Sequence, residues 1–191
     1  MKRLVPWLAA LAVLIGARTA RSTTIIPPTF DELVDSADTI FVGTAIDRHT
    51  EWEVRRDGRA IVTWVTFDVE RVLKGSLGLR TQLRFLGGTI GDLRLEVADM
   101  PEFHIGDRDM LFLETERRAI SPLVGMAYGR LRIMRDPSRG LDEIRTHDGA
   151  PIGAVEALGT RLTPSLQAPR SMAYRDFESA VRQRVAARRG R

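Results

Sequence analysis

The chain contains no cysteine among its 191 residues. This absence excludes disulfides, thiolate zinc sites, iron–sulfur clusters and a cysteine nucleophile. The sequence also lacks the HExxH pattern of zinc proteases and the GxSxG pattern of serine hydrolases. Its three histidines, His49, His104 and His147, are widely spaced. We therefore predict no catalytic residues, no metal site and no cofactor, and we expect a protein that is not an enzyme.

No apolar run is long enough for a membrane-spanning helix, which needs roughly 20 apolar residues. Residues 4–15 are apolar apart from Pro6, and Lys2 and Arg3 precede them. Small residues follow, and this layout is typical of a secretory signal. We predict a signal peptide at residues 1–22 and an exported bacterial protein, periplasmic or secreted, with no stable membrane anchor after cleavage. The alternative is an uncleaved N-terminal anchor.

The basic charge is confined to the two ends of the chain. The formal net charge is +4, and residues 1–22 alone carry that amount. Residues 170–191 contain seven Arg against Asp176 and Glu178, so the stretch 23–169 is acidic overall. An acidic body repels phosphate groups on average. We therefore expect no nucleic-acid partner.

The 43% hydrophobic content is enough for one domain with a packed core. Thr29 and Glu32 are spaced as a capping box and predict a short helix that ends near Ser36 or Ala37. Residues 39–46 and 60–73 alternate with a period of two, which predicts an antiparallel hairpin around a charged loop at 47–59. Both faces of the first strand are apolar or small, so we expect it to be central. Shorter strands are predicted at 82–86, 93–97, 110–113, 128–134 and 142–146.

The C-terminal part predicts a helix joined to the rest by an irregular segment. Residues 149–170 are rich in Pro and Gly, and we predict a linker or a loose extension. Residues 171–191 form a basic helix, in which Glu178 can pair with Arg182 one turn later. An apolar stripe follows one side of it, at Tyr174, Phe177, Val181 and Val185. A short helix, five to seven short strands and a terminal helix predict a mainly β fold, a small barrel or sandwich.

Two motifs resemble a known family. The sequence ADTIFVGT at 37–44, followed by VTFDVERVLKG at 65–75, is similar to bacterial netrin-like domains. These belong with the tissue inhibitors of metalloproteinases and share their OB-type barrel. GGTIG at 87–91 and PEFHIGDRDMLFL at 101–113 look like a group of uncharacterised exported bacterial proteins. The resemblance implies a small OB-like antiparallel barrel over residues 23–148, with a short N-terminal helix and a C-terminal amphipathic helix.

The resemblance also implies that the protein binds other proteins. The animal inhibitors begin with a cysteine whose amine and carbonyl engage the protease zinc, and this chain has no cysteine. That mechanism is therefore not transferred. We expect a non-enzymatic exported protein-binding module, and a secreted metalloprotease is one candidate partner.

The candidate binding surface combines the first hairpin with a glycine-rich segment. Trp52 lies among arginines, as at many protein contact sites; alternatively, Trp52 packs on its own loop and Trp64 covers the outer face of the sheet. No helix start follows the glycines at 87–91, so they predict a turn or a β-bulge rather than a phosphate cradle. The surface comprises Trp52, Arg55, Arg56, Arg59, Gly87, Gly88, Gly91 and His104.

Two other functions are consistent with the sequence. An envelope structural or accessory protein would use the basic helix at 171–191 for contact. A hydrolase would need an unrecognised site built from distant carboxylates and a histidine, with His104 as the candidate.

Overall fold

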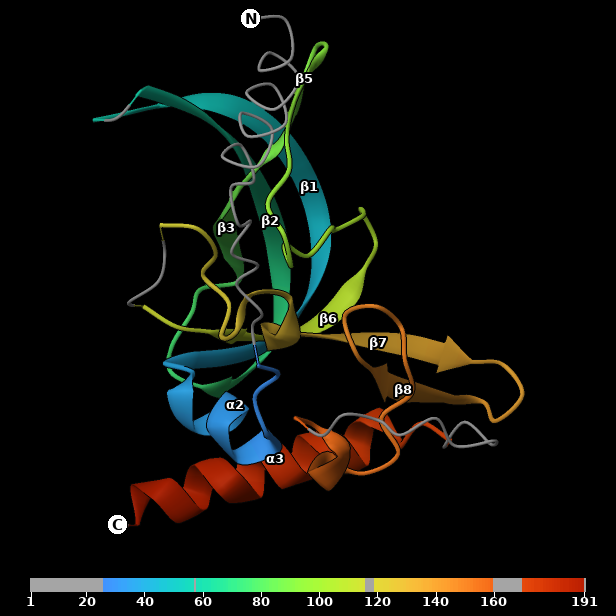
Figure 1. Cartoon of the computed structure of the whole chain (residues 1–191). Coiled ribbons are helices and arrows are strands. Elements are labelled where there is room, and N and C mark those ends of the chain that lie inside the picture. Colours follow the sequence, from blue (N-terminus) through green and yellow to red (C-terminus); the bar gives the residue numbers. More distant parts are fainter. Residues whose placement is uncertain (1–25, 57, 116–118, 160–169, 191) are drawn as a thin grey trace, which may run out of the picture.

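The computed structural model describes residues 26–56, 58–115, 119–159 and 170–190. The predicted signal peptide at 1–22 lies outside these residues. The fold is mainly β, with one six-stranded antiparallel sheet and two helices packed together on one side of it (Figure 1). In the described part of the chain, no helix is long and apolar enough to cross a membrane.

The elements follow one another as a short helix, eight strands and a long helix. The helices are α2 (Phe30–Ser36) and α3 (Tyr174–Arg189), with 3₁₀ turns at Met126–Gly129 and Val155–Ala157. The strands are β1 (Thr39–Arg55), β2 (Gly58–Lys74), β3 (Arg80–Leu86), β4 (Gly88–Ile90), β5 (Leu93–Leu95), β6 (Arg108–Leu113), β7 (Arg130–Asp136) and β8 (Leu141–Arg145). The sheet order is β3-β2-β1-β6-β7-β8, and β4 and β5 form a separate hairpin.

The β1–β2 hairpin is longer than the sequence predicts. The predicted loop at 47–59 is wrong, because both strands have 17 residues and Arg55 already pairs with Gly58. Charged residues suggested a loop, but the strand alternation continues through them. Three register shifts between Ile40 and Asp47 interrupt the pairing, and such bulges bend a strand. The far end of the hairpin projects away from both helices (Figure 1).

The two faces of the sheet carry separate cores. Ile40 and Val42 of β1 join the core under α2 and α3, whereas Phe41 and Ala45 join the core on the opposite side. We call these sides the helix face and the groove face. The prediction of a central first strand with two buried faces is confirmed.

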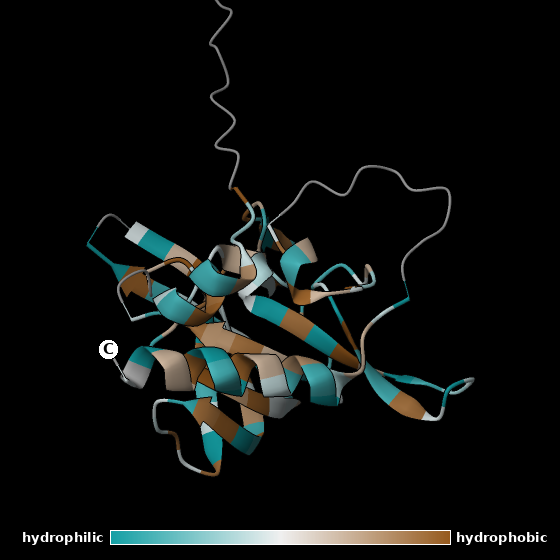
Figure 2. Ribbon diagram, turned by 90° about the horizontal axis from the view of Figure 1, so that it is seen from below, coloured by the Kyte–Doolittle hydropathy of each residue, from teal (hydrophilic) through white to brown (hydrophobic). Residues whose placement is uncertain are grey.

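Both helices adopt the predicted local structure. The Oγ1 of Thr29 accepts a hydrogen bond from the backbone N–H of Glu32, whose carboxylate accepts one from the Thr29 N–H, so the capping box is confirmed. The predicted stripe of α3 is buried along its length, at Tyr174, Phe177, Val181 and Val185. Figure 2, seen from the helix side, shows α3 lying across the strands.

The sheet is open rather than closed. Within the described residues no pairing joins β3 to β8, and no closed barrel is found. The mainly β class is confirmed, and the OB-like barrel remains a prediction. The outer edge of β8 is covered, since the Ile144 N–H donates to the Met172 carbonyl and Arg145 bridges Pro151. Ile152 is buried, so this part of the predicted linker packs on the domain, and residues 160–169 lie outside the description.

Candidate functional site

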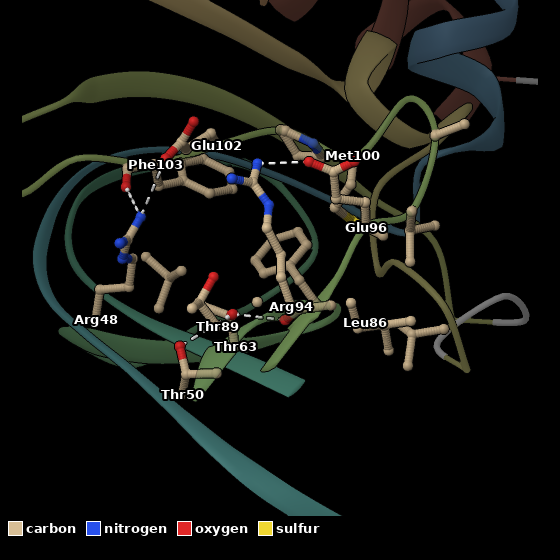
Figure 3. Close-up of a pocket in the computed structure, with 18 residues that line it drawn as sticks. Arg48, Thr50, Thr63, Leu86, Thr89, Arg94, Glu96, Met100, Glu102 and Phe103 are labelled. Atoms are coloured by element: carbon tan, nitrogen blue, oxygen red, sulfur yellow. Dashed lines mark hydrogen bonds and ion pairs between the residues drawn. The ribbon is translucent and has the colours of Figure 1, made fainter. Parts of the chain in front are cut away.

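A pocket of about 520 Å³ opens on the groove face (Figure 3). Strands β1, β2 and β3 form one side, and the β4–β5 hairpin with residues 96–103 forms the other. Gly87 and Gly88, with φ of +107° and +138°, connect β3 to β4 in backbone conformations that favour glycine. A Cβ on Gly88 would lie 2.5 Å from the Oγ1 of Thr63. Glycine therefore lets β4 cross the sheet closely enough to form the pocket.

The floor of the pocket is apolar with a pair of hydroxyl groups. Phe85 and Phe103 pack with ring centroids 5.1 Å apart, and Val65 lies beside them in the lining. The Thr63 hydroxyl donates to the Gly87 carbonyl at 2.7 Å and lies 3.4 Å from the Thr50 hydroxyl. A floor of this kind suits a ligand with both apolar and hydrogen-bonding groups.

Two arginines approach the pocket from different walls. Arg48 extends from β1 and donates to the Phe103 carbonyl at 3.2 Å, and Arg94 extends from β5 (Figure 3). Arg48 pairs with Glu102 at 3.6 Å, and Arg94 pairs with Glu96 at 2.7 Å. The two glutamates are each 73% exposed, and exposed ion pairs contribute only about 0–1 kcal/mol. A carboxylate of a partner can therefore replace either glutamate at little cost.

The wall at 102–107 is held in place by a buried arginine. Arg130 donates to the Glu102 carbonyl and, at 2.6 Å, to a carboxylate oxygen of Asp107. Its guanidinium lies 4.3 Å from the ring centroid of Phe103. Burial raises the pKa of Asp107, but hydrogen bonds from the His104 N–H and Arg130 outweigh it and hold that pKa below its ordinary value. Arg130 and Asp107 thus position the wall without lining the pocket.

Asp109 is the buried carboxylate beneath this wall. Its Oδ1 lies 3.0 Å from the Arg130 Nε, but this ion pair lacks hydrogen-bond geometry. Burial raises the pKa of Asp109 to about 6, with Arg130 opposing the shift. Asp109 does not line the pocket, so this buried carboxylate lies in the packing beneath the wall.

The structure places the predicted surface residues on or beside the groove face. Gly87 and Gly88 line the pocket, and Gly91 connects β4 to β5. Trp52 is 42% exposed and lies on the same side of β1 as Arg48 and Thr50, because alternate residues share a face.

The other predicted residues lie farther from the pocket. Arg55, Arg56 and Arg59 lie at the end of the β1–β2 hairpin. The His104 side chain is exposed and absent from the lining, with its Nδ1 3.6 Å from Asp107. Trp64 lies on the opposite side of the sheet and its Nε1 donates to Glu51 at 2.7 Å, in agreement with the interpretation that it covers the outer face.

Several pocket residues were missed from the sequence. Arg48 and Thr50 share the groove face with Trp52 only because the bulge between Ala45 and Asp47 shifts the alternation of β1 by one residue. The pattern of residues 39–46, continued without that bulge, would place them on the helix face with Ile40 and Val42. Nothing local marks Arg94 or Glu96, because their place depends on the crossing of β4 over the sheet. Among the described residues, no group of three or more His, Asp or Glu side chains could hold a metal ion.

No protein-family model, curated protein or solved structure matches this chain. The resemblance to netrin-like domains therefore remains a prediction from the sequence motifs.

Proposed function

We propose that the protein is an exported, non-enzymatic module that binds a protein partner on its groove face. The observation that carries the proposal is the continuity of this face. The pocket leads without a change of strand face to the exposed side chains of Trp52 and Val54. Aromatic and arginine side chains beside an apolar pocket are the usual composition of a protein contact site.

The OB-like, netrin-like barrel belongs to the same proposal. OB-type folds are partly open barrels that bind their ligands over the second and third strands. Here Thr63 and Val65 of β2 and Phe85 of β3 line the pocket, which supports this assignment. A secreted metalloprotease is the partner class that the resemblance suggests.

The contacts of α3 favour the groove face over the basic helix as the binding surface. Arg184 lies 2.6 Å from Asp35, and Arg182 lies 2.8 Å from Glu178. The apolar stripe of the helix is buried in the core. An envelope accessory protein that binds through the apolar stripe of α3, or through Arg182 and Arg184, would have to give up these internal contacts.

A hydrolase is the less favoured alternative. Asp107, the carboxylate closest to the candidate His104 in the described contacts, is already paired with Arg130. A base committed to a buried arginine is poorly placed to accept a proton.

Quantitative capture tests the proposal. The tagged chain, its Trp52→Ala variant and the control variant Leu79→Ala would be incubated with secreted and envelope fractions of the source organism. Leu79 is 88% exposed, precedes β3 and does not line the pocket. We expect a stoichiometric protein partner for the wild type and for Leu79→Ala, and at least about a tenfold loss for Trp52→Ala. Equal capture by Trp52→Ala, with an unchanged melting temperature, would contradict the proposal. If the partner is a protease, inhibition is titrated next.

A further inference from the structure

The outer part of β1 has a free edge. Residues 39–44 pair with β6, and the Ala45 N–H donates to the Asp107 carbonyl. From Asp47 to Val54, the described residues give β1 a backbone partner only in β2. Unpaired edges of this kind accept an additional strand readily.

The direction of the free backbone groups follows from one hydrogen bond. The Gly87 N–H donates to the Ile61 carbonyl at 2.8 Å, so the backbone groups of Ile61 point away from β1. Because direction alternates along a strand, those of Val62 point toward β1. Its register partner is Glu51, whose backbone groups therefore point toward β2.

The neighbours of Glu51 then point outward. By the same alternation, the N–H and C=O groups of every second residue of β1 face the free edge. These residues are Arg48, Thr50, Trp52 and Val54. Their side chains lie on the groove face, since Arg48 and Thr50 line the pocket. One strand edge therefore offers backbone hydrogen bonds and groove-face side chains together.

The side chains along this edge select the chemistry of the partner. Arg48 brings a positive charge to the inner end, with Arg94 on the facing wall. Trp52 and Val54, which are 42% and 77% exposed, make the outer end apolar. The three acidic residues of β1 alternate with these and have other neighbours. Glu53 is paired with Arg84 at 2.6 Å, Glu51 accepts the hydrogen bond from Trp64, and Asp47 lies 3.6 Å from the Nδ1 of His49.

We propose that the partner contributes an extended segment that pairs with the free edge of β1. The segment carries an acidic residue opposite Arg48 and an apolar residue opposite Trp52, four positions away. Side chains directly opposite in neighbouring strands lie about 5 Å apart on the same face, so both contacts form at once. This inference rests on the proposed function, because it specifies how the partner occupies the groove face.

A defined peptide probes the pairing. Acetyl-Leu-Thr-Thr-Thr-Glu-Thr-Thr-Thr-Leu-amide has an apolar residue four positions to each side of its glutamate, so it fits in either strand direction. Its glutamine counterpart is the matched control. Both are titrated into the full chain by amide NMR, with hydrogen exchange measured for Thr50 and Trp52.

The expected result has two parts. The glutamate peptide binds at least about fivefold more tightly than the glutamine peptide, because it forms a charge-assisted pair with Arg48. It also slows exchange of the Thr50 and Trp52 amides at least about fivefold. Equal affinities, binding without protection of these amides, or no binding would each overturn the inference.

A pair of variants separates edge pairing from side-chain contact. Thr50→Pro removes an N–H that faces outward, whereas Thr50→Val removes only the hydroxyl. We expect Thr50→Pro to lose at least about fivefold more affinity for the glutamate peptide than Thr50→Val. Equal losses would count against edge pairing. If Thr50→Pro does not fold, amide protection in the wild type decides the question.

The capture experiment separates this inference from the proposed function. Trp52-dependent capture of a partner, without protection of the two amides in that complex, would overturn edge pairing and leave the binding module standing. Trp52-independent capture would overturn both.

Discussion

The two faces of the same sheet are closed to different degrees. On the helix face, α2 and α3 bury a continuous core, and Arg184 ties the two helices together through Asp31 and Asp35. On the groove face, β4, β5 and residues 96–103 cover only part of the strands and leave a pocket of about 520 Å³. Beyond that pocket, Trp52 and Val54 are exposed.

Along the β1–β2 pair, the part near β6 differs from the outer part in how far it is covered. Near β6, both sides of β1 are buried, so its side chains contribute to the core. Farther along, the strand keeps its pairing with β2 but has neither a second neighbour nor a complete cover. Exposed apolar side chains next to a pocket are typical of interaction surfaces. We therefore assign stability to the helix face and propose the groove face for binding.

The largest expected effect on stability lies in the helix-face core. Phe112 is fully buried there, so Phe112→Ala is expected to lower the free energy of unfolding by about 3–5 kcal/mol. Val54→Ala, the matched change on the groove face, is expected to alter it by less than about 0.5 kcal/mol. Urea denaturation measures both. A large loss of unfolding free energy for Val54→Ala would show that the end of the hairpin is packed. The two faces would then not differ in their contribution to stability.

The second prediction concerns the acid sensitivity of the helix face. Burial raises the pKa of Glu178, but hydrogen bonds from Tyr174, Arg71 and Arg182 outweigh it and lower the pKa to about 2, from an ordinary 4.5. A lowered pKa stabilises the fold above pH 4.5, and this contribution is lost as the pH falls toward 2. It amounts to about 3 kcal/mol. Glu178→Gln should therefore destabilise the protein at neutral pH and flatten its acid dependence between these values.

The groove face is expected to show the opposite pH dependence. Burial raises the pKa of Asp109 from 3.8 to about 6. A raised pKa stabilises the fold below pH 3.8, and this contribution is lost as the pH rises toward 6, by at most about 3 kcal/mol. Asp109→Asn should remove that decline. The free energy of unfolding of the wild type and of both variants is measured every half pH unit. If the contributions of Glu178 and Asp109 changed with pH in the same direction, the opposite pH dependence of the two faces would be contradicted.

The smallest of these effects distinguishes two glycines of the groove cover. Gly88→Ala combines a φ of +138° with a close contact to Thr63, and we expect a loss of about 2–3 kcal/mol. Gly91 has a φ of +57° and no atom near its missing Cβ, so Gly91→Ala should cost about 1 kcal/mol. Thermal unfolding of the two variants measures both losses of stability. Equal losses would mean that the crossing of β4 is not constrained at Gly88.

Local patterns predicted the helix face well. The capping box at Thr29, the buried stripe of α3 and the pair between Glu178 and Arg182 are confirmed, because each depends on residues within one helix. The two-sided burial of β1 follows equally from its alternation.

The groove face was harder to predict. The segment at 47–59 was predicted as a loop from its charge, although Thr50, Trp52 and Val54 share one face of the strand. The bulge between Ala45 and Asp47 moves that face to the side opposite Ile40 and Val42, and the sequence does not mark this bulge. The position of Arg94 depends on β4 crossing the sheet, and no local pattern encodes that crossing. The pocket therefore arises from tertiary contacts that sequence periodicity does not reveal.

Site-specific photo-crosslinking in cells tests whether a partner binds the groove face. A photoreactive amino acid would replace Val54 on the groove face or, in a matched chain, the exposed Gln183 of α3. We expect a discrete adduct with a protein partner from position 54 and none from position 183. An adduct from position 183 alone, or from neither position, would contradict the assignment of binding to the groove face.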